Sequence, residues 1–112
     1  MTRLTLVLLT LAAFSAASGQ LLFKIGAKGC TSWLDFFNTP IFLGLFLYGV
    51  GTVLWIYALS FEKLVNVYAF TGLTFVLVYL GGVLLLNESM SIQAIIGVAA
   101  VLGGLFLIVS YN

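Results

Sequence analysis

The chain alternates four long uncharged stretches with short segments that hold all of its charge. The uncharged stretches are Leu4–Phe23, Phe36–Phe61, Leu64–Asn87 and Ser89–Asn112. A helix needs about 20 apolar residues to cross the roughly 30 Å hydrocarbon core of a bilayer, and each stretch is long enough. The pattern therefore predicts an all-α membrane protein with four transmembrane helices in a compact bundle.

Helix-breaking residues between the stretches predict where the helices begin and end. We expect one domain over residues 1–112, with helices at about 4–27, 40–60, 64–86 and 91–110. Pro40 suits the first turn of the second helix, and Ser89 or Ser91 can cap the fourth. Because short turns join antiparallel neighbours, the second, third and fourth helices should form a tight up-down-up stack.

The first stretch has a competing interpretation as a cleavable signal peptide. Arg3, an apolar run and the small residues Ser15–Gly19 resemble that kind of segment. The apolar run continues to Phe23, however, and cleavage would leave no soluble domain to export. We expect the stretch to be retained as the first transmembrane helix.

Composition supports a membrane protein and excludes several other classes. Hydrophobic residues make up 63% of the chain and charged residues 6%, and the mean hydropathy is +1.28. A net charge of +1 provides no basic surface for a nucleic acid. With no His and a single cysteine, Cys30, we expect no metal site, no cofactor and no internal disulfide. An enzyme is the least expected class, because no nucleophile–base pair can be assembled.

The positive charges do not favour one orientation in the membrane. An even number of helices places both termini on one side, with Arg3 and Lys63, while Lys24 and Lys28 lie on the other. Because each side carries two positive residues, the positive-inside rule predicts no preferred orientation. Two interpretations stay open: an orientation set weakly by the first helix, or insertion in both orientations with pairing as an antiparallel dimer.

Small residues in the fourth helix bear on assembly. Ala99 with Gly103, and Ala100 with Gly104, form two small-xxx-small pairs that let helix backbones approach closely in lipid. This face could pack against a second subunit, giving a homodimer or a heterodimer with a similar small protein. It could equally pack inside the four-helix bundle.

A polar stripe at the end of the first helix is the main candidate for chemistry. Gln20, Lys24 and Lys28 are successive i, i+4 neighbours and so share one face. The lysines could simply extend to the lipid headgroups. Alternatively, the stripe receives an anionic headgroup, with lysine as the charge that binds phosphate.

The remaining polar residues add fewer candidates. Tyr48 and Tyr79 lie within apolar helices, and their hydroxyls need partners, so at least one should face an interior cavity. Glu62 and Glu88 lie in turns, where a solvated residue or an ion-pair partner is expected rather than a proton carrier. Aromatic residues near both boundaries have the pattern of interfacial belts; these are Trp33, Phe36, Phe37, Tyr57, Phe61 and Tyr68.

Several segments together resemble a known family. They are Gly19–Lys24, Trp55–Leu59, Leu73–Tyr79, Asn87–Glu88 and Gly97–Gly104. In this order they resemble the small-multidrug-resistance-like branch of the drug/metabolite transporter (EamA-like) superfamily. Within it, the chain is most similar to the four-helix flippase subunits that move undecaprenyl-phosphate-linked aminoarabinose across the bacterial inner membrane. The resemblance implies a multi-pass inner-membrane protein in a compact bundle that often works as a dimer.

One departure from the drug-exporting members distinguishes between substrates. Those members carry a glutamate three residues before the glycine that matches Gly19, whereas this chain has Ala16 there. Without that acid, no carboxylate can alternate between a proton and a cationic drug. An anionic lipid, in contrast, would find Lys24 and Lys28. The expected substrate-binding residues are Lys24, Gln20, Lys28, Tyr48, Tyr79 and Glu88.

Three functions remain open at this point. The first is translocation of a polyprenyl-phosphate-linked sugar, or of the bare lipid carrier. The second is proton-coupled export of a drug or other cation by the same fold. The third is a non-transporting subunit of a larger membrane complex. Only the first makes use of the two lysines.

Overall fold

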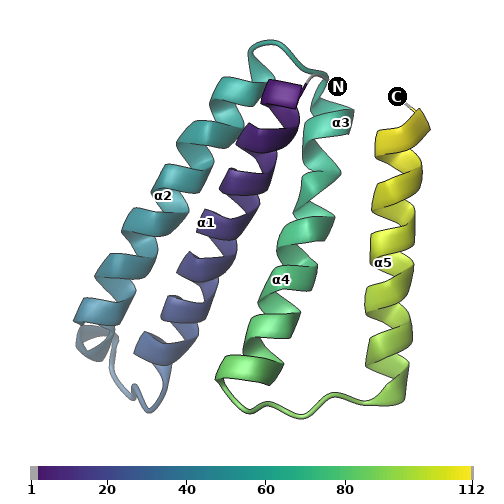
Figure 1. Cartoon of the computed structure of the whole chain (residues 1–112). Coiled ribbons are helices and arrows are strands. Elements are labelled where there is room, and N and C mark those ends of the chain that lie inside the picture. Colours follow the sequence, from purple (N-terminus) through teal and green to yellow (C-terminus); the bar gives the residue numbers. More distant parts are fainter. Residues whose placement is uncertain (1–2, 112) are drawn as a thin grey trace.

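The computed structural model describes residues 3–111, and its regular structure is helical throughout this range (Figure 1). The elements are α1 (Arg3–Ala27), the short 3-10 helix η1 (Trp33–Phe36), α2 (Thr39–Leu59), α3 (Leu64–Tyr68), α4 (Phe70–Leu85) and α5 (Ile92–Tyr111). α3 and α4 together make one span, so four helices are long and apolar enough to cross a membrane. The all-α, four-helix fold class is confirmed. Both ends of the described chain lie at the same end of the molecule, as an even helix count requires (Figure 1).

The third span is interrupted once, which the sequence did not indicate. α3 ends at Tyr68 and α4 begins at Phe70, with Ala69 between them in a right-handed helical conformation (φ −57°, ψ −28°). The Gly72 amide donates to the Ala69 carbonyl at 3.0 Å, a tighter i, i+3 bond. The span therefore continues past the interruption with a local change in helix type.

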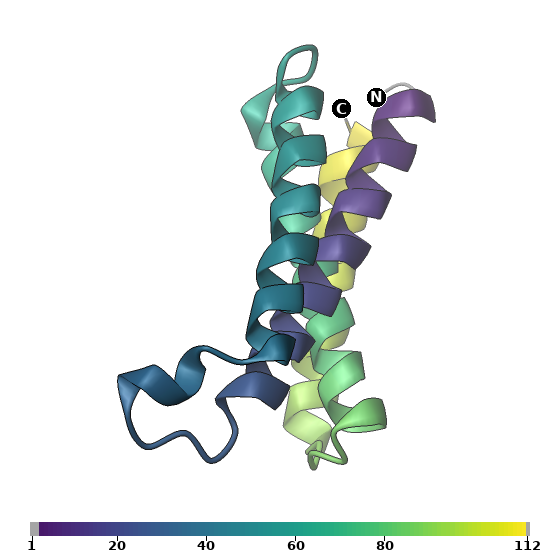
Figure 2. The same cartoon turned by 90° about the vertical axis from the view of Figure 1, so that its left-hand side faces the viewer.

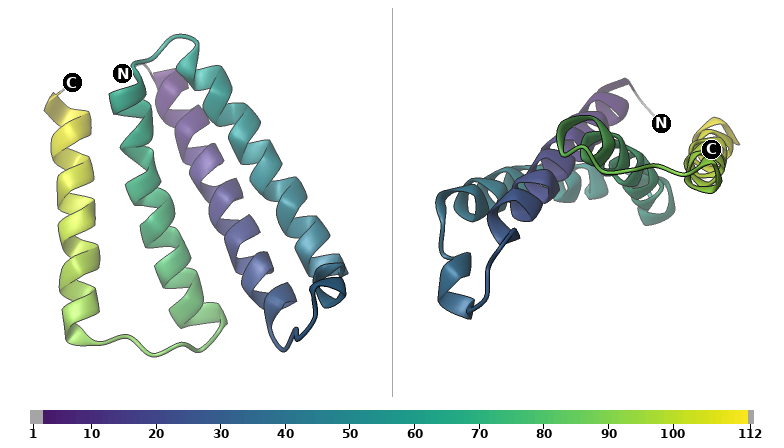
Figure 3. Two further views of the ribbon diagram at one scale, coloured as in Figure 1. Left: turned by 180° about the vertical axis from the view of Figure 1, so that it is seen from behind. Right: turned by 90° about the horizontal axis from the view of Figure 1, so that it is seen from below.

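The order of the helices in space differs from the expected stack. α1 lies between α2 on one side and α3–α4 on the other, so α2 has α1 as its main neighbour (Figures 1 and 3). The expected tight stack of the second, third and fourth helices was therefore wrong. Glycines explain the preference of α2 for α1. A Cβ placed on Gly19 would lie 2.7 Å from the Gly44 carbonyl oxygen, and one placed on Gly51 would lie 2.8 Å from the Ala12 carbonyl oxygen.

α5 lies on the outer side of α4, at the edge of the molecule (Figures 1 and 3). Val98, 8% exposed, is its one buried residue among those whose burial is described. A Cβ placed on Gly97, Gly103 or Gly104 would meet no other atom within 4 Å. Gly104 lines a groove between α4 and α5 together with Gly72 and Val101, whereas Gly103 does not. The molecule is flat, with extents of 46 × 35 × 18 Å.

The connection between α1 and α2 projects to one side of the helices (Figure 2). Asn38 fixes its end, because its Nδ2 donates to the Gly26 carbonyl at 2.9 Å and its Oδ1 accepts from the Ile41 amide at 3.1 Å. Pro40 lies in the first turn of α2, as expected. Of the two candidate caps of α5, Ser91 accepts a hydrogen bond from the Ala94 amide at 3.1 Å.

Candidate functional site

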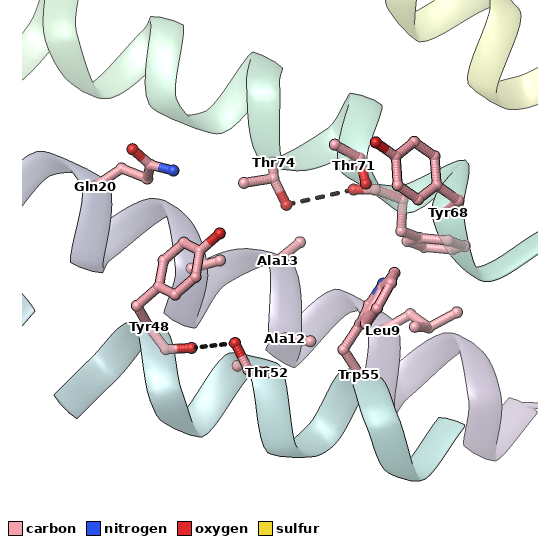
Figure 4. A pocket seen from close by; sticks show the side chains of 13 residues that line it. Leu9, Ala12, Ala13, Gln20, Tyr48, Thr52, Trp55, Tyr68, Thr71 and Thr74 are labelled. Carbon is pink, nitrogen blue, oxygen red and sulfur yellow. Dashed lines mark hydrogen bonds between the residues drawn. The ribbon is translucent and has the colours of Figure 1, made fainter. Parts of the chain in front are cut away.

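A pocket of about 470 Å³ lies between α1, α2 and the α3–α4 span (Figure 4). Its floor is one face of α1, where Leu9, Ala12, Ala13 and Ala16 follow the i, i+3, i+4, i+7 spacing of a helix. The methyl side chains of the three alanines leave space between the helices on either side. Ala16 is the position at which the drug exporters of the resembled family carry a glutamate. None of the described residues that line the pocket is charged.

The lining of the pocket carries hydroxyl groups on its two walls and one side-chain amide, that of Gln20, on α1. Thr52 Oγ1 donates to the Tyr48 carbonyl at 3.0 Å, and Thr74 Oγ1 donates to the Phe70 carbonyl at 3.3 Å (Figure 4). Each threonine hydroxyl donates its proton to a carbonyl of its own helix, and its oxygen can still accept a hydrogen bond from a ligand. Within the described chain, the side chains of Gln20 and Thr71 make no hydrogen bond. The pocket therefore offers both acceptors and free donors without a charge.

Two aromatic residues border the pocket toward the end where the chain termini lie. The rings of Trp55 and Tyr68 meet edge to face with their centroids 6.4 Å apart. At the opposite end Gln20 is directed into the space between α1 and α4 (Figure 4). The pocket thus runs along α1 from an aromatic end to an amide end.

The two lysines of the polar stripe lie beyond the amide end of the pocket. Lys24 is one helical turn past Gln20 on α1, and its side chain is exposed. It occupies the last turn of the helix, where the helix dipole favours a positive charge. Lys28 follows the end of α1 and is also exposed. Both cations therefore flank the pocket rather than line it.

The structure separates the other expected site residues. Tyr48 lines the pocket, together with Gln20. Tyr79 does not; its ring packs beside Phe75 with the centroids 6.1 Å apart. Glu88 follows the end of α4, outside the pocket, with its carboxylate folded back against Gly82.

Sequence reasoning missed the polar residues of the walls. Thr52 and Trp55 follow Tyr48 at i+4 and i+7, and Thr71 and Thr74 are three residues apart. These spacings place each set on one helix face, and they recur in otherwise apolar helices. That periodicity could have marked the two walls.

Comparison with known proteins adds a relative to this geometry. A flippase subunit aligns with almost the whole length of the chain, whose four long apolar helices are candidate membrane spans. This relative is named probable 4-amino-4-deoxy-L-arabinose-phosphoundecaprenol flippase subunit ArnE, from Aeromonas salmonicida (strain A449). The two are 29% identical over 108 residues, which cover 92% of this chain and 95% of the relative. No protein-family model and no solved structure matches the chain.

The relative and the four spans agree with two expectations drawn from the sequence. The resemblance to the four-helix flippase subunits is confirmed, at the distance that 29% identity indicates. The location in the bacterial inner membrane is confirmed as well.

Proposed function

We propose that the chain is a flippase subunit that translocates a polyprenyl-phosphate-linked sugar, or a related anionic lipid carrier, across the bacterial inner membrane. The observation that carries the proposal is the continuity of one face of α1. That face forms the uncharged floor of the pocket, reaches the amide of Gln20 and ends at Lys24. The name of the A. salmonicida relative, which specifies an aminoarabinose linked to phosphoundecaprenol, supports this substrate class.

The physical problem of such a substrate is its headgroup. The polyprenyl tail can stay in the lipid, but the sugar and the phosphate must leave water. A buried polar group without a partner costs on the order of 1–3 kcal/mol. Gln20, Tyr48 and the wall threonines can replace the water of the sugar hydroxyls, and Lys24 can offset the phosphate charge at the entrance. The pocket suits a headgroup rich in hydroxyl groups.

Export of cationic drugs is the weaker candidate for this pocket. A cation needs a counter-charge where it leaves water, and the residues described around the pocket include no carboxylate. Ala16 lines the pocket at the position where such an acid would lie. We therefore do not propose proton-coupled exchange.

We also propose that the chain works with a second small subunit, either a copy of itself or a similar protein. The relative is named as a subunit, which supports a partner. The exposed pair Ala99 and Gly103 on α5 offers a surface on which two helices can approach closely. A transporter rather than an enzyme is the class that this arrangement supports.

Substitution of Lys24 tests the proposed function. Lys24→Ala should abolish translocation of the phosphate lipid in proteoliposomes and leave the helical content unchanged, because this exposed side chain contributes little to packing. Lys24→Arg should keep part of the activity, since the charge survives although its donor geometry changes. Lys28→Ala should have a smaller effect.

Lys63→Ala provides the matched control, because Lys63 is an exposed lysine at the opposite end of the helices. It should transport at the rate of the unmodified chain. Undiminished transport by Lys24→Ala at normal protein levels would show that the phosphate is bound elsewhere.

A further inference from the structure

Two oxygen atoms at the turn between α2 and α3 are buried without a hydrogen-bond partner. They are Oε2 of Glu62 and Oδ1 of Asn66. The Asn66 residue is only 6% exposed, and Glu62 is half-buried. Because buried polar atoms in folded proteins almost always have a partner, two such atoms in one turn need a physical explanation.

The two side chains lie at the same end of the hydrophobic core. The Glu62 amide donates to the Ala58 carbonyl at 3.0 Å, which holds Glu62 beside the end of α2. Asn66 directly precedes Val67, whose amide donates to the Lys63 carbonyl at 3.0 Å in the first turn of α3. Ala58 and Val67 are fully buried in one cluster. The carboxyl group and the side-chain amide therefore lie in one tight turn at the edge of the same core.

No charged side chain is paired with the Glu62 carboxyl group. Within the described chain, Glu62 makes neither a side-chain hydrogen bond nor an ion pair. α4 and α5 contain no charged residue. The other ionisable side chains described at this end of the helices are exposed; they are Arg3 on α1, Tyr57 on α2, Lys63 in the turn and Tyr68 on α3. The solvated residue or ion-pair partner expected at Glu62 is therefore a half-buried, unpaired acid.

A proton is the partner that suits these two oxygens. A carboxylate oxygen and an amide oxygen are both acceptors, so they cannot bond to each other while Glu62 is ionised. A protonated carboxyl group has an O–H donor, which Asn66 Oδ1 can accept. A water molecule or a metal ion would need space beside the oxygens, but both are shielded from solvent. Neither residue lines the pocket or the groove between α4 and α5.

We propose that Glu62 and Asn66 form a proton-binding site that couples the proposed translocation to release of the proton. In the bound state, a proton from the aqueous phase is attached to Glu62 Oε2, and this O–H group donates to Asn66 Oδ1. On release, the proton returns to water at this end of the molecule and leaves two buried acceptors, which is unfavourable. The turn then opens so that water reaches them. The inference rests on the proposed function, because the coupled step is that transport.

The turn is connected to both sides of the aromatic end of the pocket. Trp55 lies three residues before Ala58 on α2, and Tyr68 lies two residues after Asn66 on α3. Their rings meet edge to face at that end of the pocket. α3 is separated from α4 at Ala69, so α3 can move as a short unit. Opening of the turn should therefore separate the two rings and admit water to the pocket.

The proton site lies outside the pocket, which separates it from the mechanism of a drug exporter. A proton on Glu62 would not compete with a substrate for one carboxylate, because Glu62 is not part of the pocket lining. The proton would instead act on the substrate through the position of α3. This arrangement needs no acid at Ala16.

Infrared difference spectroscopy in lipid nanodiscs tests for the proton. The chain has only three acidic side chains, Asp35, Glu62 and Glu88, so the C=O band of a protonated carboxyl group can be assigned by substitution. We expect a band that disappears as the pH rises. It should be absent in Glu62→Gln and shifted in Asn66→Leu, which removes the accepting oxygen. Glu88→Gln is the matched control and should keep the band.

The fluorescence of Trp55 tests the opening of the pocket. In a Trp33→Phe background Trp55 is the only tryptophan. Quenching by acrylamide should increase as the pH rises, because release of the proton admits water to the aromatic end. Glu62→Gln should keep the weaker quenching at every pH, since its amide group can donate to Asn66 Oδ1 and has no proton to release in this range. The same amide keeps both buried groups paired, so this variant should stay folded.

Transport in proteoliposomes tests the coupling. A pH gradient should change the rate of lipid translocation by the unmodified chain, with its partner subunit where one is required. The same gradient should have no effect on Glu62→Gln.

The outcomes separate this inference from the proposed function. Translocation that does not respond to the gradient, or a carboxyl band that persists in Glu62→Gln, would overturn the coupling site and leave the flippase standing. A chain that moves no lipid would overturn the proposed function and the coupling. The band of Glu62 and the pH-dependent quenching would then still show proton binding at this turn.

Discussion

At the scale of single residues, one carboxylate organises the connection between α1 and α2. Asp35 Oδ2 accepts hydrogen bonds from the Thr31 amide at 3.2 Å, the Thr31 hydroxyl at 3.3 Å and the Ser32 amide at 3.2 Å. The bond from the Thr31 amide is the largest cause that lowers the pKa of Asp35 below its ordinary 3.8, followed by the bond from the Ser32 amide. The ionised form therefore favours the folded loop.

This carboxylate predicts how the loop responds to pH. Because folding lowers the pKa of Asp35, the ionised carboxylate stabilises the folded loop fully at a pH above the ordinary pKa. This stabilisation is lost as the pH falls through the lowered pKa. The fluorescence of Trp33, followed in a Trp55→Phe background, should be constant from neutral pH down to about pH 5 and change only below 3.8. Asp35→Asn should show the acid form at every pH. A transition between pH 5 and 7 would contradict this assignment.

Residue patterns indicated some parts of the site and missed others. Gln20 and Tyr48 were expected from their polarity in apolar helices, and both line the pocket. The fold of Glu88 against Gly82 depends on the positive φ of Asn87, and nothing in the residue types required that conformation. A turn residue could be located from sequence, but the direction of its side chain could not.

At the scale of helices, the contact between α1 and α2 depends on glycine. Gly19→Ala should destabilise the protein by about 1–3 kcal/mol, because its Cβ would press on the backbone of α2, which cannot move aside as a side chain can. The measurement is the midpoint of unfolding in a titration with a denaturing detergent. Gly49→Ala, on the open side of α2, should leave the midpoint unchanged or raise it. Equal midpoints for Gly19→Ala and the unmodified chain would mean that α1 and α2 are further apart at Gly19 than the structure places them.

The four spanning segments could be predicted from the sequence, but which helix packs against which could not. Length and hydropathy are enough to mark a spanning segment, and four such helices are found. α2 is apolar on all sides, so no stripe shows which face meets another helix. Gly44 and Gly51 allow a close approach, but their residue type does not show that α1 is the helix that makes it.

At the scale of the whole molecule, the small face of α5 predicts assembly. Replacing Gly103 by leucine should leave the fold of the single chain intact, because a Cβ at this exposed position meets nothing within 4 Å and Gly103 lies outside the groove between α4 and α5. The same change should weaken a dimer by holding backbones apart. Mass measurement in lipid nanodiscs should show dimers for the unmodified chain and a shift toward monomers for the variant. Only monomers for the unmodified chain would exclude a homodimer.

The position of α5 also has a consequence for synthesis in the cell. α5 has the highest mean hydropathy of the four spans and the smallest buried share. Its insertion therefore depends on transfer into lipid more than on contacts with the helices made before it. The ribosome completes α1, α2 and the α3–α4 span earlier, so the pocket can close while α5 is still being translated. A mutation on the exposed face of α5 that preserves its hydropathy should then alter which chains associate in the membrane, and leave the yield of inserted protein unchanged.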